Sequence, residues 1–392
     1  MVRIAIIITR LSICHLRSMV TKSVPRLCRK KFLYLVLVLC LLTPAVVNFW
    51  RGTWYMFDLL FPGDAVLSAL VGVNASFGII FIMTAIEDRL KKFINEAKAK
   101  NALYLVLIYL LANLTVASWR GLWMILDHYT TTSSTSAGVS HGIGFLIVFL
   151  LKTPRSIIAV PGYCVSERQT EPSEVILTVK HCLRSKTACY SHVLNSFVTV
   201  YVIGAGVIVY WRGTWIILSN VTSPCGSKFT YSVLVLGLGY TVFISCYFMG
   251  EYLLSFELNL ANSLLTRAMG TVVAKSFLYL LGLGVVASWQ GIWHLMDIYL
   301  LSDQPIVSAL VGHFVAAGVL FLSQGSLTLL SPPATCAIPE ERMLDGLHLG
   351  NFLKIRSESS KAGENYSLEY HLPEENQDYP HAVDLLVCLQ IL

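Results

Sequence analysis

Eight tryptophans are the most distinctive residues of this sequence, because all of them fall within four copies of one five-residue motif. Three copies read WRGTW or WRGLW, the fourth reads WQGIW, and in three of the four an Asp follows the second Trp by four residues. The third copy has Ser219 in place of the acid, and the fourth has Gln290 in place of the Arg. The repeated motif comprises Trp50, Arg51, Gly52, Trp54, Asp58, Trp119, Arg120, Gly121, Trp123, Asp127, Trp211, Arg212, Gly213, Trp215, Trp289, Gly291, Trp293 and Asp297.

The chemistry open to this motif is packing and binding. Two Trp four residues apart share one helix face. An Arg and an Asp seven residues apart share that face too, so a cation–π contact and an ion pair are feasible. The intervening Gly lets a neighbouring helix approach closely. One interpretation is an anchor at the membrane interface, where indole rings prefer to lie, that also clamps helices together. The other is a ring of four motifs that binds a ligand or gates an ion.

The two departures from the motif look complementary. The third copy keeps Arg212 but lacks the acid, whereas the fourth copy keeps Asp297 but lacks the Arg. We therefore predict an ion pair between Arg212 and Asp297.

Few other side chains suggest chemistry. His141 and His313 occupy corresponding places in two apolar runs; without a carboxylate at that depth to relay protons, we interpret them as hydrogen-bonding a neighbouring helix. The ten cysteines form no CxxC or Cys/His metal spacing, and the sequence has no HExxH or paired span aspartates. We expect a protein that is not an enzyme and uses no metal or cofactor. Asn220 begins a glycosylation sequon.

Composition indicates a membrane protein. Apolar residues make up 55% of the 392 and charged residues only 13%, whereas soluble domains are nearer a quarter charged. The net charge of +6 does not indicate a nucleic-acid partner, because the basic residues lie between apolar runs. A lipid bilayer is the partner that this pattern predicts. About 20 apolar residues cross it as a helix, and eight runs qualify: 32–50, 65–84, 103–119, 137–151, 193–211, 230–249, 272–289 and 306–330.

The distribution of Lys and Arg predicts the orientation. If these runs alternate across the membrane, 25 of the 29 basic residues fall on one side, and basic loops stay in the cytoplasm. Both termini are then cytoplasmic. The predicted divisions are a basic segment at 1–31, a four-span half at 32–151, a cytoplasmic connection at 152–192, a second four-span half at 193–330, and an acidic tail at 331–392 whose composition favours disorder.

The predicted fold is therefore an all-α transmembrane bundle made of four parallel two-helix repeats. Each repeat joins an odd run, a Trp motif and an even run. The even runs repeat as well, because SALVG at 68–72 recurs at 308–312. Parallel repeats of this kind are related by an axis along the membrane normal.

Eight runs, a WRGxW motif at the end of each odd run and four parallel units resemble the Fuseless family of multi-pass membrane proteins, over roughly residues 30–335. The resemblance implies a plasma-membrane protein at the presynaptic release site that supports the placement of voltage-gated calcium channels and neurotransmitter release. Other membrane proteins, calcium-channel subunits among them, are the partners it implies.

Two function classes stay open. The first is a membrane organiser that acts by binding partner proteins, which the resemblance favours. The alternative is a transporter or channel for a small solute or ion, which the internal repeats favour. Against the alternative, the runs lack the buried carboxylates or rows of Arg that ion pathways usually contain.

Overall fold

The computed structural model describes residues 32–61, 65–167, 172–177, 188–222, 226–259 and 264–335. The basic segment 1–31 and the tail beyond residue 335 lie outside these residues. Within the described ranges the chain is helical, with short connections and no strand, as the sequence predicts. Seven helical stretches are long and apolar enough to cross a membrane. They are Phe32–Leu60, Ala65–Ala85, Lys100–Thr130, Tyr190–Thr222, Lys228–Gly250, Met269–Tyr299 and Pro305–Leu322.

Four long helices form the centre of the molecule, and we refer to them as the core helices: α2 (Thr43–Leu60), α5 (Lys100–Thr130), α9 (Ala205–Thr222) and α11 (Leu264–Tyr299). Each core helix contacts the next one along the chain, and α11 contacts α2. The four core helices therefore form a closed ring.

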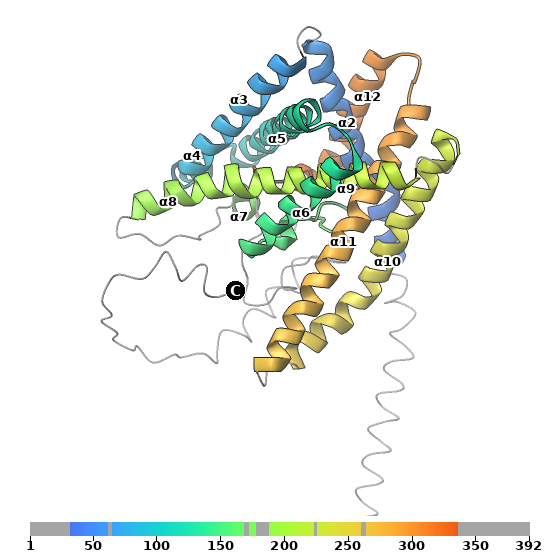
Figure 1. The fold of residues 1–392 in the computed structure, drawn as a ribbon. Coiled ribbons are helices and arrows are strands. Elements are labelled where there is room, and N and C mark those ends of the chain that lie inside the picture. The colour runs from blue at the N-terminus through green and yellow to red at the C-terminus, as the bar shows by residue number, and fades with distance from the viewer. Residues whose placement is uncertain are drawn as a thin grey trace, which may run out of the picture.

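Four further helices flank the ring: α3 (Ala65–Ala85), α6 (Ser134–Leu150), α10 (Lys228–Asn259) and α12 (Pro305–Leu322). Each packs mainly on the core helix that follows it, α3 on α5, α6 on α9 and α10 on α11, a pair seen side by side in Figure 1. The last flanking helix, α12, packs on α2 and so joins the last repeat to the first. A flanking helix thus belongs in space with the core helix of the next repeat.

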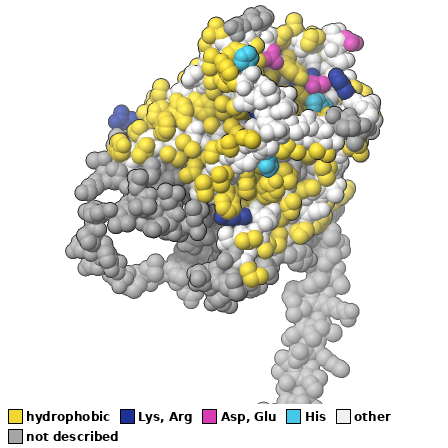
Figure 2. All heavy atoms as spheres, in the orientation of Figure 1, with side chains coloured by type: hydrophobic (Ala, Val, Ile, Leu, Met, Phe, Trp, Pro, Cys, Tyr) yellow, Lys and Arg dark blue, Asp and Glu magenta, His cyan; other side chains and the backbone are white. Residues whose placement is uncertain are grey.

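The outer surface of this bundle is apolar. In the apolar windows of α3, α10 and α12 only 28–33% of residues are buried, against half or more in the core helices. Figure 2 shows hydrophobic side chains over most of the visible face and few charged ones. A helical surface of this composition suits lipid, in which each helix satisfies its own backbone groups.

The core helices do not end where the sequence suggested. The odd runs were expected to stop at the first Trp of each motif, for example at 50 and 119, but α2 continues to Leu60 and α5 to Thr130. The motif therefore lies inside each helix, about three turns from its end. Trp and Arg are common at the membrane surface, which predicts that each span ends at the motif. In the structure these side chains face other helices instead.

Two apolar connections form part of the core. One lies within the predicted cytoplasmic connection at 152–192. The other follows α12, so the predicted span at 306–330 is a helix only as far as Leu322. After α6, the 3₁₀ helix η2 (Pro154–Ile157) and the residues up to Ser166 are largely buried. After α12, which ends at Leu322, the 3₁₀ helix η5 (Ser326–Leu329) is buried in the same way. Apolar composition alone does not separate a membrane helix from a buried loop.

The two halves of the chain share local features that single repeats do not. A π-helical turn precedes the motif in α2 (η1, Val38–Leu42) and in the equivalent helix α9 (η3, Val198–Gly204). Each half ends in a buried 3₁₀ loop, η2 in the first and η5 in the second. The ring of four is therefore built from two similar halves.

Candidate functional site

The eight tryptophans lie together around the centre of the core-helix ring. The first Trp of each motif forms one tier, and these four side chains are only 3–4% exposed. Adjacent rings in this first tier meet edge to face, with centroids 5.1–5.3 Å apart around a closed circuit. The first tier consists of Trp50, Trp119, Trp211 and Trp289.

The second Trp of each motif forms a wider tier one helical turn further along. Its rings also meet at nearly right angles, with centroids 5.9–6.0 Å apart on all four sides. Edge-to-face contact is the arrangement that aromatic quadrupoles favour. The second tier consists of Trp54, Trp123, Trp215 and Trp293.

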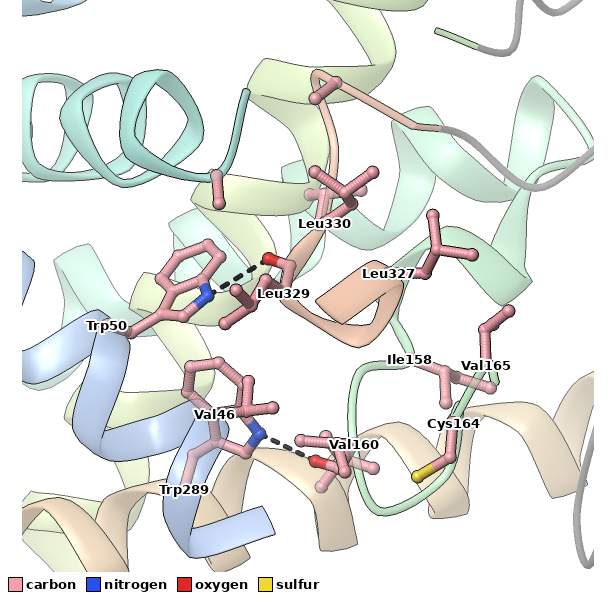
Figure 3. Packing of buried hydrophobic residues seen from close by; sticks show 14 of the residues in the cluster. Val46, Trp50, Ile158, Val160, Cys164, Val165, Trp289, Leu327, Leu329 and Leu330 are labelled. Carbon is pink, nitrogen blue, oxygen red and sulfur yellow. Dashed lines mark hydrogen bonds between the residues drawn. The ribbon is translucent and has the colours of Figure 1, made fainter. Parts of the chain in front are cut away.

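The two buried loops close the first tier from one side. Trp50 donates its indole N–H to the carbonyl oxygen of Leu329 at 3.3 Å, and Trp289 donates to that of Val160 at 2.7 Å (Figure 3). The other two rings donate in the same way, Trp119 to Pro332 and Trp211 to Ile157. Each loop thus accepts two indole bonds, which satisfies backbone groups that burial would otherwise leave unpaired.

Ion pairs link three of the four repeats to the preceding repeat in the ring. Arg120 Nε lies 2.7 Å from Asp58 Oδ1, and Arg212 Nε lies 2.8 Å from Asp127 Oδ1. Arg51 Nε lies 2.6 Å from Asp297 Oδ1, which joins the first repeat to the last. The guanidinium side chains are nearly fully buried, at 0–5% exposed, while the carboxylates are 33–40% exposed.

The predicted pair of Arg212 with Asp297 is therefore wrong. The two departures from the motif meet each other instead: Gln290 Nε2 donates to Ser219 Oγ at 2.6 Å, in the place of the fourth ion pair. The missing acid and the missing base belong to one site, so the ring keeps three ion pairs and one neutral hydrogen bond.

The motif glycines allow the flanking helices to approach. A Cβ added at Gly52 would lie 2.6 Å from the carbonyl oxygen of Ala309, and one at Gly121 would lie 2.7 Å from that of Ala69. Gly213 faces the backbone of α6 and Gly291 that of α10 in the same manner. A serine on the flanking helix then reaches the Arg, as when Ser68 Oγ accepts from Arg120 and Ser308 Oγ from Arg51.

The two span histidines hydrogen-bond neighbouring helices. His313 Nδ1 lies 2.7 Å from Thr53 Oγ1 and its Nε2 lies 2.6 Å from the Tyr109 hydroxyl, so it bridges α2 and α5. In the other half, His141 on α6 contacts Thr214 at 2.9 Å and Tyr279 at 3.0 Å.

The fourth residue of each five-residue motif is the sequence feature that marks these histidine sites. It is Thr in the two repeats whose motif faces a histidine, and Leu122 or Ile292 in the repeats whose motif faces Val73 or Leu236. Each half of the chain therefore has one motif with Thr and one with Leu or Ile. The motifs with Thr are in α2 and α9, the two core helices that a π-helical turn precedes.

A cavity of about 270 Å³ lies among the two tiers, lined by all eight tryptophans together with Tyr55, His294 and Asp297. A second cavity, of about 450 Å³, shares His294 and Asp297 with it and includes Ser219 and Lys228. Among the described residues no group of three or more His, Cys, Asp or Glu is placed to hold a metal ion. The geometry therefore offers noncovalent binding at an aromatic cavity.

The glycosylation sequon lies apart from this site. Asn220 is in the last turn of α9, and its Nδ2 donates to Ser134 Oγ at 3.1 Å. Both side chains are at the surface.

Comparison with known proteins gives one match. The Fuseless family model matches residues 30–330, which include every core helix, every flanking helix and all four motifs. No curated protein and no solved structure matches the chain. Because the matched residues make up well over half of its length, this chain is a membrane-type helical protein that belongs to the Fuseless family.

Proposed function

We propose that this protein is a non-enzymatic membrane organiser, which supports the placement of voltage-gated calcium channels at presynaptic release sites by binding partner proteins. Membership of the Fuseless family supports this role. The observation that favours an organiser over a channel is the closed axis of the bundle. Four interlocked indoles of the first tier, with two buried loops hydrogen-bonded beneath them, fill the place where a conduit would run.

The proposal includes eight membrane crossings with both termini in the cytoplasm. Helix α6 has 17 residues, one fewer than α12, which is long enough to qualify as a span. It packs on α9 through Gly213 in the way that α12 packs on α2 through Gly52. Because α6 and α12 occupy equivalent places, we expect α6 to lie in the membrane as α12 does. Eight spans also agree with the distribution of basic residues between the two sides of the membrane.

A partner-binding surface is available on the side assigned to the cytoplasm. Helix α4 (Glu87–Glu96) continues from α3 with mixed charge, and its Lys92 and Phe93 are 77% and 67% exposed. We take α4 as the candidate partner-binding surface, because it places exposed charged and aromatic side chains on that side of the protein.

Affinity isolation of the full chain from neural membranes in mild detergent tests the proposal. We expect recovery of a calcium-channel subunit with the unaltered chain, and loss of most of it with Arg89→Glu/Lys92→Glu. The matched control, Arg89→Lys/Lys92→Arg, keeps the charge and is expected to retain the partner. Absence of any channel subunit, together with solute flux in liposomes that hold the purified chain, would contradict an organising role and favour a transporter.

A further inference from the structure

We propose that the second tryptophan tier is a binding site for a small organic cation of the quaternary ammonium class. The inference concerns a ligand site in the body of the protein, and it does not depend on the organising role. Four features carry it: the spacing of the rings, the charge of the lining, the small number of hydrogen-bond acceptors among the residues that line the cavity, and the presence of a neighbouring cavity.

The spacing suits a cation on the axis of the ring. The four ring centroids are 5.9–6.0 Å apart on every side. For a square arrangement of these centroids, the centre lies about 4.2 Å from each one, inside the ~6 Å range within which the face of an indole attracts a cation. A methylated ammonium group at this point would contact four Trp rings at once. Trp is the aromatic residue with the strongest attraction of this kind.

The charge of the cavity lining favours a cation over an anion. Asp297 contributes a carboxylate, and the lining includes no Lys or Arg among the described residues. Although Arg51 neutralises Asp297, its guanidinium is 4% exposed while the carboxylate is 33% exposed, so the negative group lies nearer the space that a ligand would enter. The Oδ1 atom accepts from Arg51 and from the Tyr55 hydroxyl.

The chemistry of the lining selects a quaternary ammonium over a primary amine. A primary ammonium carries three N–H donors that need acceptors, and the eight indoles offer none because an indole N–H only donates. The acceptors of the lining are confined to Tyr55, His294 and Asp297, and Asp297 Oδ1 already accepts from Arg51 and Tyr55. A quaternary ammonium has no N–H donors and therefore loses nothing in this aromatic environment. The volume of about 270 Å³ is just below the ~300–1,000 Å³ of pockets for drug-sized ligands, which fits a molecule as small as choline.

We assign the second cavity as the route of entry, because both cavities are lined by His294 and Asp297. The second cavity also includes Lys228 and Ser219, and at Ser219 the neutral hydrogen bond from Gln290 replaces an ion pair. The opposite end of the tryptophan cavity is closed by the first tier and the two loops. A ligand is thus expected to arrive from the end of the bundle where the core helices finish.

Tryptophan fluorescence tests the site directly, because every tryptophan of the chain belongs to the two tiers. The full chain, purified in mild detergent, is titrated with choline and in parallel with 3,3-dimethylbutan-1-ol, which has the same shape without the charge. We expect a saturable change in emission with choline, and binding of the neutral analogue weaker by at least about tenfold. Calorimetry with both compounds checks the affinities. Equal responses to the two compounds, or no saturable response to choline, would overturn the proposal.

A pair of matched variants separates the charge of the site from general stability. Asp297→Asn and Asp58→Asn each break one ion pair of the same geometry, but only Asp297 lines the cavity. We expect Asp297→Asn to weaken choline binding about tenfold and Asp58→Asn to weaken it no more than about twofold, because the nearer charge acts more strongly. Both variants must elute as monodisperse protein. Equal weakening by the two would contradict the assignment of the carboxylate.

Discussion

Gln290 donates a hydrogen bond to Ser219 at the one place in the ring where neither residue of the Arg/Asp pair is present. The neighbouring sites keep both partners, and their buried guanidiniums depend on the carboxylates for compensation. A buried charge that loses its partner is costly, whereas removal of both charges is often tolerated. The chain itself therefore contains an example of the neutral replacement that the other sites should accept.

This relationship predicts the outcome of substitutions at the equivalent pair. Asp127→Ser leaves the fully buried Arg212 without its carboxylate and should lower the free energy of unfolding by about 3 kcal/mol. The double variant Arg212→Gln/Asp127→Ser imitates Gln290 and Ser219 and should recover most of that loss. Thermal unfolding of the purified protein in detergent measures both. A double variant that is less stable than Asp127→Ser would show that the two sites are not equivalent.

At the histidine sites too, the residues of one repeat can be replaced by those at the equivalent positions of another. Thr53→Leu removes the partner of His313 Nδ1 and should cost about 1–3 kcal/mol, because a buried ring nitrogen is left unsatisfied. Adding His313→Val reproduces the apolar pair Leu122 and Val73 of the second repeat. The double variant is expected to be more stable than Thr53→Leu alone by thermal unfolding. Strictly additive losses would argue that the two side chains act independently.

Close helix approach predicts a strong effect of adding one methyl group. A Cβ at Gly213 would lie 2.6 Å from the carbonyl oxygen of Ala137 on α6, so Gly213→Ala should separate the two helices and cost about 1–3 kcal/mol. Gly237→Ala is the control, since nothing lies within 4 Å of its added Cβ. That variant should be neutral or stabilised by up to about 1 kcal/mol through helix propensity. Similar folded yields for the two variants would contradict the packing described for α6 and α9.

The packing of the second tier predicts that the size of the aromatic side chain at position 123 affects the stability of the bundle. Trp123→Ala removes edge-to-face contacts with both neighbouring rings, whereas Trp123→Phe keeps part of the aromatic area. The Ala variant should therefore give a lower yield of monodisperse protein in detergent than the Phe variant. Indistinguishable yields would indicate that this indole does not hold the core helices together.

Much of this arrangement could be predicted from the sequence. The recurrence of WRGxW predicts four equivalent helices, and Gly between the two Trp predicts close packing, because both are local properties of a helix face. The partner of each Arg could not be assigned in the same way, since pairing depends on which flanking and core helices meet. The sequence shows that the third repeat lacks the acid and the fourth lacks the Arg. Local pattern does not show that the two replacements, Ser219 and Gln290, contact each other, whereas Arg212 and Asp297 each have another partner.

The buried loops were beyond sequence reading for a different reason. The loops around Ile157 and Leu329 are as apolar as a membrane helix. Hydropathy does not show whether a backbone carbonyl accepts a hydrogen bond within its own helix or from a distant indole. The bonds that fix these loops join residues 54 and 279 positions apart. No local pattern specifies contacts of that range.

Eight crossings predict which loops a protease can reach. Tags at residue 1, near residue 170 and at residue 392 should be protected in intact cells, and a tag near residue 225 should be cleaved, because the first three are assigned to the cytoplasm. Permeabilised cells, in which every tag should be cleaved, provide the control. Cleavage of the tag near residue 170 from outside would rule out the eight-span arrangement.

Packing of the last repeat on the first, which places the flanking helix α12 against α2, is the central claim. Cysteine cross-linking in the membrane tests it most directly. An added Cβ at Gly312 lies 2.9 Å from Asn48 Oδ1, so Asn48→Cys/Gly312→Cys, in a chain otherwise free of cysteine, should form a disulfide under mild oxidation. The control pair, Asn48→Cys/Gly142→Cys, joins α2 to the open face of α6 and should stay reduced. Failure of the first pair to cross-link in folded protein, or equal cross-linking of both pairs, would contradict a ring closed by the first and last repeats.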